Sequence, residues 1–147
     1  MQLSLSADAL MWNAVKQSAS WKNAILFLLR GVMRSSSGEI DEYELVGESL
    51  LVGLYVLVFA RQSLLPDISD VTCSYVGAGL LGKLGNKGAV GVRLRLGVKS
   101  VCFVCAHLAA HQEEVRRRNA DWAVIDTRLF GENLVSEHGI NCLFFSI

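Results

Sequence analysis

One long apolar run constrains the fold of this chain more than any other feature. The run from Ser49 to Ala60 is rich in Val, Leu and Tyr and presents no polar face. A strand with one wet face alternates apolar and polar residues, so this run predicts a strand in the middle of a sheet that is covered on both sides. Its apolar stretch is too short for a membrane-spanning helix, which needs about 20 residues.

The composition agrees with extensive burial. Of the 147 residues, 52% are hydrophobic and 19% are charged, whereas a soluble domain usually has about a quarter charged residues. We therefore expect a single incomplete domain, residues 1–147, whose apolar faces are covered by further parts of a larger fold. The 14 basic and 14 acidic residues cancel, so no bulk charge points to nucleic acid or to an anionic membrane.

The remaining pattern predicts an α/β protein. Apolar residues at helical spacing mark two helices, and β-rich runs mark strands around a tight Gly97-Val98 turn that is typical of a β-hairpin. Regular βαβ spacing is missing, so a layered fold with a mixed sheet fits better than a Rossmann fold or a barrel. The expected helices are Asp8–Arg30 and Ala109–Leu129, and the expected strands are Tyr43–Val46, Ser49–Ala60, Asp70–Val76, Ala89–Leu96, Ser100–Ala106 and Gly139–Ile147.

The cysteines predict free thiols. Cys102 and Cys105 form a lone C-x-x-C inside an apolar run. Residues three apart on a strand point to opposite faces, so this pair cannot hold a metal together. Buried thiols in a reducing cytosol are the simplest interpretation. The N-terminus lacks the features of a signal peptide, and we expect a cytoplasmic protein that is at most peripheral at membranes.

A glycine-rich segment, residues 77–88, is the first candidate for chemistry. It has five glycines in twelve residues, together with Lys83, Asn86 and Lys87. Glycines let a backbone approach a ligand closely, and lysine and asparagine can donate to phosphate oxygens. The spacing is not that of a Walker A loop. A surface turn with solvated lysines remains the alternative.

The second candidate is the segment from His107 to His111. His107 ends an apolar strand, where α/β folds place active sites, and could donate to a phosphoryl oxygen or orient another group. A partly buried histidine satisfied by backbone is the alternative, and His111 is expected at the rim. The run Arg116 to Arg118 follows on a helix and spreads over about 200°, so at least one or two of these arginines should face solvent. Pairing of Glu113 with Arg117 and of Glu114 with Arg118 is also expected.

Together these residues are more specific than separately. Gly85 to Val90 (GNKGAV), His107 to His111 (HLAAH) and Arg117 to Trp122 (RRNADW) occur in order and at close spacing. In this the chain resembles the inositol polyphosphate 5-phosphatases, and weaker similarity extends over nearly the whole sequence. The resemblance implies the deoxyribonuclease-I-like fold, here part of a four-layer α/β sandwich with mixed β-sheets flanked by helices.

The resemblance also implies an activity and a site. Members of the family remove the 5-phosphate from phosphoinositides or soluble inositol phosphates with Mg²⁺ and an activated water. By resemblance, His107 would contact the scissile phosphate and Asn86 would shape its pocket, with Lys83, Lys87 and His111 at the rim. Three further residues resemble a loop that dips into the lipid surface in some members, although helix packing competes with that role: Leu10, Met11 and Trp12.

The departures from the family pattern set a limit on the expected activity. Gln2 stands where the family has its metal-binding glutamate, and a neutral amide is a poor ligand for Mg²⁺. The Gly-Asp-x-Asn segment and the later motifs that supply the base should follow the last strand, and they do not occur in the 147 residues. Ala106 replaces a serine beside the histidine. We therefore expect a chain truncated at both ends and inactive by itself.

Two other functions remain open on the sequence. One is a non-catalytic module that binds a phosphoinositide or a partner through Lys83 and Lys87. The other is a nuclease or sphingomyelinase, since the same superfold carries several chemistries. The combination of GNKG with HLAAH argues against these enzymes, and no basic stripe with interleaved aromatic residues favours nucleic acid.

Overall fold

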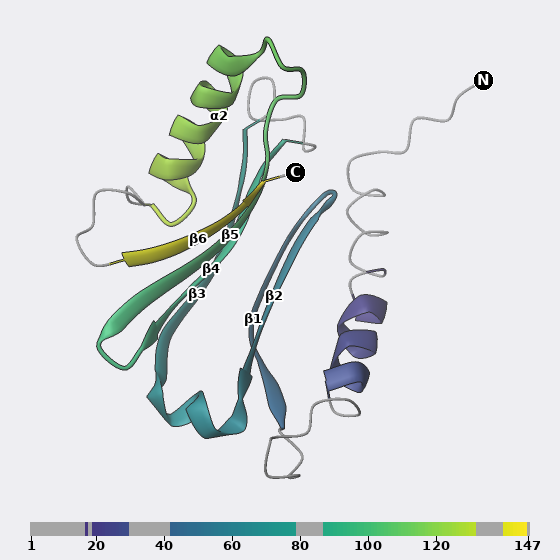
Figure 1. The fold of residues 1–147 in the computed structure, drawn as a ribbon, viewed down its shortest axis with the longest axis vertical. Helices are drawn as coiled ribbons and strands as arrows, with labels where there is room; N and C mark the ends of the chain where they lie inside the picture. The colour runs from purple at the N-terminus through teal and green to yellow at the C-terminus, as the bar shows by residue number, and fades with distance from the viewer. Residues whose placement is uncertain (1–16, 18, 30–41, 79–86, 132–139, 147) are drawn as a thin grey trace.

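The computed structural model describes residues 17, 19–29, 42–78, 87–131 and 140–146. These residues form layers of helix, sheet, sheet and helix (Figure 1). Helix α2 (Val115–Arg128) covers a four-stranded sheet, a two-stranded sheet lies against the opposite face, and the N-terminal helical residues 19–29 lie outside that second sheet. The predicted α/β sandwich with mixed sheets flanked by helices is confirmed.

The two-stranded sheet corrects the prediction of one long strand. Strands β1 (Tyr43–Leu51) and β2 (Leu54–Arg61) pair antiparallel, with Leu51 opposite Leu54. The predicted strand Ser49–Ala60 is therefore wrong, because the chain reverses at Val52-Gly53, where Gly53 has a φ of 79°. That conformation is accessible to glycine at little steric cost, and the apolar run gave no polar residue to mark the turn.

The four-stranded sheet has the order β3-β4-β5-β6. Strands β3 (Ile68–Gly77), β4 (Gly88–Leu96) and β5 (Lys99–His107) pair antiparallel, and β6 (Ile140–Ser146) runs parallel to β5. The predicted hairpin around Gly97-Val98 is confirmed, with Gly97 at a φ of 58°. A 3-10 turn, η1 (Gln62–Asp67), connects the two sheets.

Strand β4 is covered on both faces. Its residues Ala89 and Val90, adjacent in sequence, are both fully buried, on opposite faces of the sheet. Ala89 packs with Val104 and with Ile125 of α2, whereas Val90 packs with Leu51 and Leu54 of the two-stranded sheet. The sequence signal for a doubly covered strand was therefore correct in kind but assigned to the wrong segment.

A small residue lets the two sheets approach each other. A Cβ atom on Gly47 of β1 would lie 2.7 Å from Val92 Cγ1 and 3.1 Å from Cys73 Sγ. Near the same contact, the Ser49 hydroxyl of β1 donates to the Ser74 carbonyl of β3 at 2.5 Å. This partly buried hydrogen bond helps to fix the position of β1 along the larger sheet.

Helix α2 begins later than predicted. It starts at Val115 rather than Ala109, and Val115 is 51% exposed. Ile125 and Leu129 are fully buried. Trp122 packs edge-to-face against Phe144 of β6, with ring centroids 4.9 Å apart. The apolar anchors therefore lie in the second half of the helix, and its start is fixed by contacts described below.

The cysteine and membrane expectations have mixed outcomes. Cys102 is fully buried and Cys105 is half-buried on the other face of β5, as the strand geometry predicts, and burial raises the pKa of the Cys105 thiol. Cys73 is exposed, contrary to the simplest interpretation, because β3 is the edge strand of the four-stranded sheet. Among the described residues, no helix is long and apolar enough to cross a membrane.

Several large apolar side chains are exposed, in keeping with the apolar composition. Leu143 and Phe145 of β6 are 51% and 61% exposed, and Trp21 and Phe27 of the N-terminal helix are 66% and 79% exposed. Soluble monomers rarely expose so many large apolar side chains on neighbouring elements.

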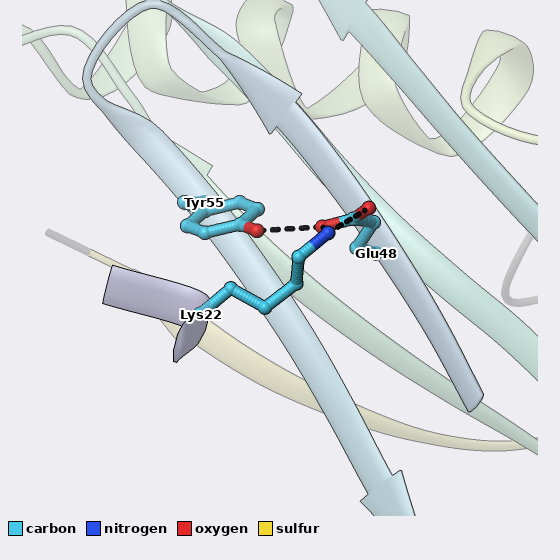
Figure 2. A network of polar contacts seen from close by, with 3 residues as sticks. All are labelled: Lys22, Glu48 and Tyr55. Atoms are coloured by element: carbon cyan, nitrogen blue, oxygen red, sulfur yellow. Dashed lines mark hydrogen bonds and ion pairs between the residues drawn. The ribbon is translucent and has the colours of Figure 1, made fainter. Parts of the chain in front are cut away.

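A polar network ties the N-terminal helix to the two-stranded sheet. Lys22 Nζ lies 3.0 Å from Glu48 Oε1 on β1, and the Tyr55 hydroxyl on β2 donates to Glu48 Oε2 at 2.6 Å (Figure 2). These contacts lower the pKa of the Glu48 carboxyl: the Tyr55 hydrogen bond contributes most, and Lys22 adds to it against the opposing effect of burial. The network therefore stabilises the docked helix only while Glu48 is ionised.

The sign of this shift gives a pH prediction. Because its pKa is lowered, the ionised Glu48 carboxyl stabilises the fold at pH values above its ordinary pKa of about 4.5. This stabilisation is lost as the pH falls through the pKa of the folded state. Glu48 is 41% exposed, so screening limits the effect to less than about 1 kcal/mol. We expect Glu48→Gln to lower the free energy of unfolding in urea at pH 7, with the deficit shrinking at pH 3. Glu44→Gln, on the exposed face of the same strand, is the control, and an equal Glu48→Gln deficit at both pH values would contradict the network.

Candidate functional site

The candidate site lies where β4 begins and β5 ends. Gly88 pairs with His107 at the last position of the β4–β5 ladder, so Lys87 and His107 are brought to the same end of the sheet. Lys87 Nζ lies 2.7 Å from His107 Nε2, and both residues are half-buried. The sequence placed these two residues in separate candidate segments, 20 positions apart, and the antiparallel pairing joins them.

The backbone at this end of the sheet is held tightly. Gly88 has a φ of 150°, and a Cβ atom there would lie 2.1 Å from the Val76 carbonyl oxygen. The next residue back is also paired, because the Ala78 N–H donates to the Lys87 carbonyl at 2.9 Å. Only glycine fits position 88, and the close approach of β3 that it allows fixes the point from which the Lys87 side chain leaves the sheet.

The segment after His107 is clamped to helix α2. The Asp121 carboxylate accepts a hydrogen bond from the Ala109 N–H at 2.9 Å. The Arg118 guanidinium donates to three carbonyl oxygens of the same segment, at 3.4 Å to Ala109, at 3.0 Å to Gln112, and to His111. Arginine suits this role because its planar fork carries five N–H donors.

This clamp explains why the helix starts at Val115. His111 has a φ of 77°, which is rare for a residue with a side chain, and the Glu114 N–H donates back to the His111 carbonyl at 3.2 Å. Residues 111–114 therefore form a closed turn that Arg118 stabilises. The turn stops helical geometry from extending back to Ala109.

The prediction for the three consecutive arginines is confirmed for their exposure but not for their ion pairs. Arg116 and Arg117 are exposed, in agreement with a solvated face. The expected pairs of Glu113 with Arg117 and of Glu114 with Arg118 are absent from the ion pairs of the described residues, because Glu113 precedes the helix and Arg118 is directed to carbonyl oxygens. The clamp by Arg118 and Asp121 was missed, although their spacing of three puts both on one helix face.

Several predicted site residues are not tested by the structure. His111 is exposed, with its backbone held in the turn. The others lie outside the described residues: Gln2, Leu10, Met11, Trp12, Lys83 and Asn86. What the structure brings together is Lys87 and His107, next to the clamped segment.

The described residues do not form a metal centre. No group of three or more His, Cys, Asp or Glu side chains gathers within residues 17, 19–29, 42–78, 87–131 and 140–146. Asp121, the acidic residue of the clamp, already accepts a hydrogen bond from the Ala109 N–H. These residues suit an anion rather than a divalent cation, since Lys87 supplies positive charge and N–H donors.

A cavity among the described residues, away from Lys87 and His107, does not suit a phosphate. It has a volume of about 320 Å³ and lies between the two sheets at the opposite end of β4 and β5. Its wall includes Val58, Leu94 and Phe103, and it is almost wholly apolar. Burying a phosphate there would leave its charge without enough donors.

The comparisons with known proteins agree with the fold and the motifs. Residues 2–146 match Endonuclease/Exonuclease/phosphatase family 2. The chain belongs to this family. Its relatives include type I inositol polyphosphate 5-phosphatase 5 of Arabidopsis thaliana, 45% identical over 56% of this chain, and type II inositol 1,4,5-trisphosphate 5-phosphatase of Mus musculus, 36% identical over 87% of it. The resemblance to the inositol polyphosphate 5-phosphatases is thereby confirmed.

A solved member of the family has the same fold. The inositol polyphosphate 5-phosphatase domain of SPsynaptojanin, in complex with inositol (1,4)-bisphosphate and a calcium ion, matches 89% of this chain with a TM-score of 0.73 and 27% identity. The match covers 37% of that chain, and the chain spans 16% and 12% of the two curated relatives above. This chain therefore corresponds to a limited part of the solved protein and of both relatives.

Proposed function

We propose that this family member binds the phosphate of an inositol phosphate or a phosphoinositide at the end of the sheet that carries Lys87 and His107. The observation that carries the proposal is the 2.7 Å contact between these two side chains at paired strand ends. A lysine ammonium held at a fixed position is a donor for phosphate oxygens. The substrate class comes from the relatives, which are inositol polyphosphate 5-phosphatases.

The reaction proposed for the whole site is release of the 5-phosphate. In this reaction a divalent metal, Mg²⁺ in our proposal, would stabilise the charge that develops on the phosphoryl group. The described residues supply no carboxylate cluster for that metal, and by the family resemblance Gln2 would offer an amide in place of the metal-binding glutamate. We therefore assign binding and orientation of the phosphate to Lys87 and His107, and no metal-dependent step to this chain alone.

Phosphate release and binding can be measured separately. With inositol 1,4,5-trisphosphate and Mg²⁺, we expect the 147-residue chain to release no phosphate above background, because metal and base are needed for most of the rate enhancement. Calorimetry with the same compound, without Mg²⁺, should show binding that weakens as the salt concentration is raised, as expected for charge-assisted contacts. Robust phosphate release would contradict the expected inactivity, and the absence of binding would overturn the proposed function.

A lipid headgroup and a soluble inositol phosphate share this chemistry. Sedimentation with vesicles of phosphatidylcholine, with and without a phosphoinositide, distinguishes the two sources. A preference for phosphoinositide vesicles that is lost in Lys83→Ala combined with Lys87→Ala would favour the lipid and a peripheral location at cytoplasmic membranes. Contact of Leu10, Met11 and Trp12 with the lipid is part of that proposal.

A further inference from the structure

The contact between Lys87 and His107 has only one possible direction when the lysine is an ammonium. A lysine ammonium has three N–H donors and no acceptor, whereas a neutral imidazole has one donor nitrogen and one acceptor nitrogen. The 2.7 Å contact of a lysine ammonium therefore runs from Lys87 Nζ to the lone pair of His107 Nε2. His107 then carries its own proton on Nδ1.

This tautomer reverses the roles that the sequence suggested. With its lone pair engaged, His107 Nε2 has no proton to give to a phosphoryl oxygen. Lys87 uses one N–H on His107 and retains two more, together with its charge. We propose that Lys87 donates to the phosphate, and that His107 is a positioning residue that holds the Lys87 ammonium in place. The inference rests on the proposed function of this same site.

The backbone supports such a role for His107. The β4–β5 pairing of Gly88 with His107 and the hydrogen bond from Ala78 N–H to the Lys87 carbonyl fix the main chain of both partners. Lysine side chains normally lose much rotamer freedom when they bind a ligand. An ammonium that is already held by His107 loses less of it, which strengthens binding without any added contact to the ligand.

A long-range ¹H–¹⁵N NMR spectrum of the imidazole tests the tautomer directly. In the wild-type chain without ligand, we expect His107 to be protonated on Nδ1 and not on Nε2, and to remain so when inositol 1,4,5-trisphosphate is added. In Lys87→Met this single-tautomer pattern should be lost. A proton on His107 Nε2 in the wild-type chain, free or bound, would overturn the inference.

A double-mutant cycle tests whether His107 acts through Lys87. By calorimetry with inositol 1,4,5-trisphosphate, we expect Lys87→Met to weaken binding by about ten- to a hundredfold, as for loss of a charge-assisted hydrogen bond. His107→Leu should weaken binding several-fold in the wild-type background, but by less than about twofold in the Lys87→Met background. Lys99→Met, an exposed lysine at the other end of β5, is the control and should bind as the wild type does.

The outcomes separate the inference from the proposed function. Equal losses for His107→Leu in both backgrounds would show that His107 meets the ligand by itself and would overturn the inference alone. No binding by the wild-type chain would overturn the proposed function, and the donor role of Lys87 with it. Circular dichroism of each variant shows whether a loss of binding comes from unfolding.

Discussion

Gly88→Ala is expected to destabilise the chain by about 3 to 5 kcal/mol, a large share of the stability of a small domain. The alanine Cβ would lie 2.1 Å from the Val76 carbonyl oxygen, 3.0 Å from Gly77 Cα and 3.0 Å from Leu51 Cδ2. Two of these neighbours are backbone atoms, so relief requires β3 and β4 to separate. The φ of 150° adds strain, because that region is essentially restricted to glycine. Urea unfolding followed by circular dichroism measures the loss.

A matched control separates steric contact from backbone strain. Gly97 also has a positive φ, 58°, but nothing lies within 4 Å of a Cβ placed there. Gly97→Ala should therefore cost only about 1 kcal/mol, the conformational term. If Gly88→Ala cost no more than Gly97→Ala, the close approach of β3 to β4 beside Lys87 would be wrong.

The strand ends show how much of the site could be predicted from sequence. The hairpin around Gly97-Val98 was predicted, and its register alone places Gly88 opposite His107. The partner of His107 was not predicted, because the glycine-rich segment offers two lysines and only the ladder shows that Lys87 is adjacent to the paired position. Motif spacing thus located the site, and strand register decided which side chains meet.

The errors in the fold have the same physical origin. The turn at Val52-Gly53 lies inside an apolar run, because both strands of that hairpin pack against the larger sheet. Hydrophobic pattern reports burial, and it carries no mark of a reversal in which both arms are buried. The start of α2 was placed too early for a related reason. Residues 109–114 are fixed by Arg118 and Asp121 from the helix itself, which is a tertiary effect that local propensity does not contain.

Arg118→Met is expected to release the segment that follows His107. The guanidinium donates to the carbonyls of Ala109, His111 and Gln112. Methionine keeps much of the aliphatic stem but none of the donors, so the three carbonyls depend on water and the φ of 77° at His111 loses its support. Hydrogen bonds to charged groups contribute about 1.5 to 3 kcal/mol. Two of the three Arg118 bonds are exposed, so we expect the free energy of unfolding to fall by about 2 kcal/mol.

Hydrogen exchange distinguishes local release from general destabilisation. The Glu114 amide, which donates to the His111 carbonyl, should exchange much faster in Arg118→Met, while amides in the β4–β5 ladder change only by the global loss. Arg118→Lys should recover part of the effect, because one ammonium cannot span the three carbonyls as a planar fork does. Arg117→Met, exposed on the same helix, is the control and should lie within about 0.5 kcal/mol of the wild type. If Arg117→Met and Arg118→Met behaved alike, residues 109–114 would hold their turn without Arg118, and the late start of α2 would need another cause.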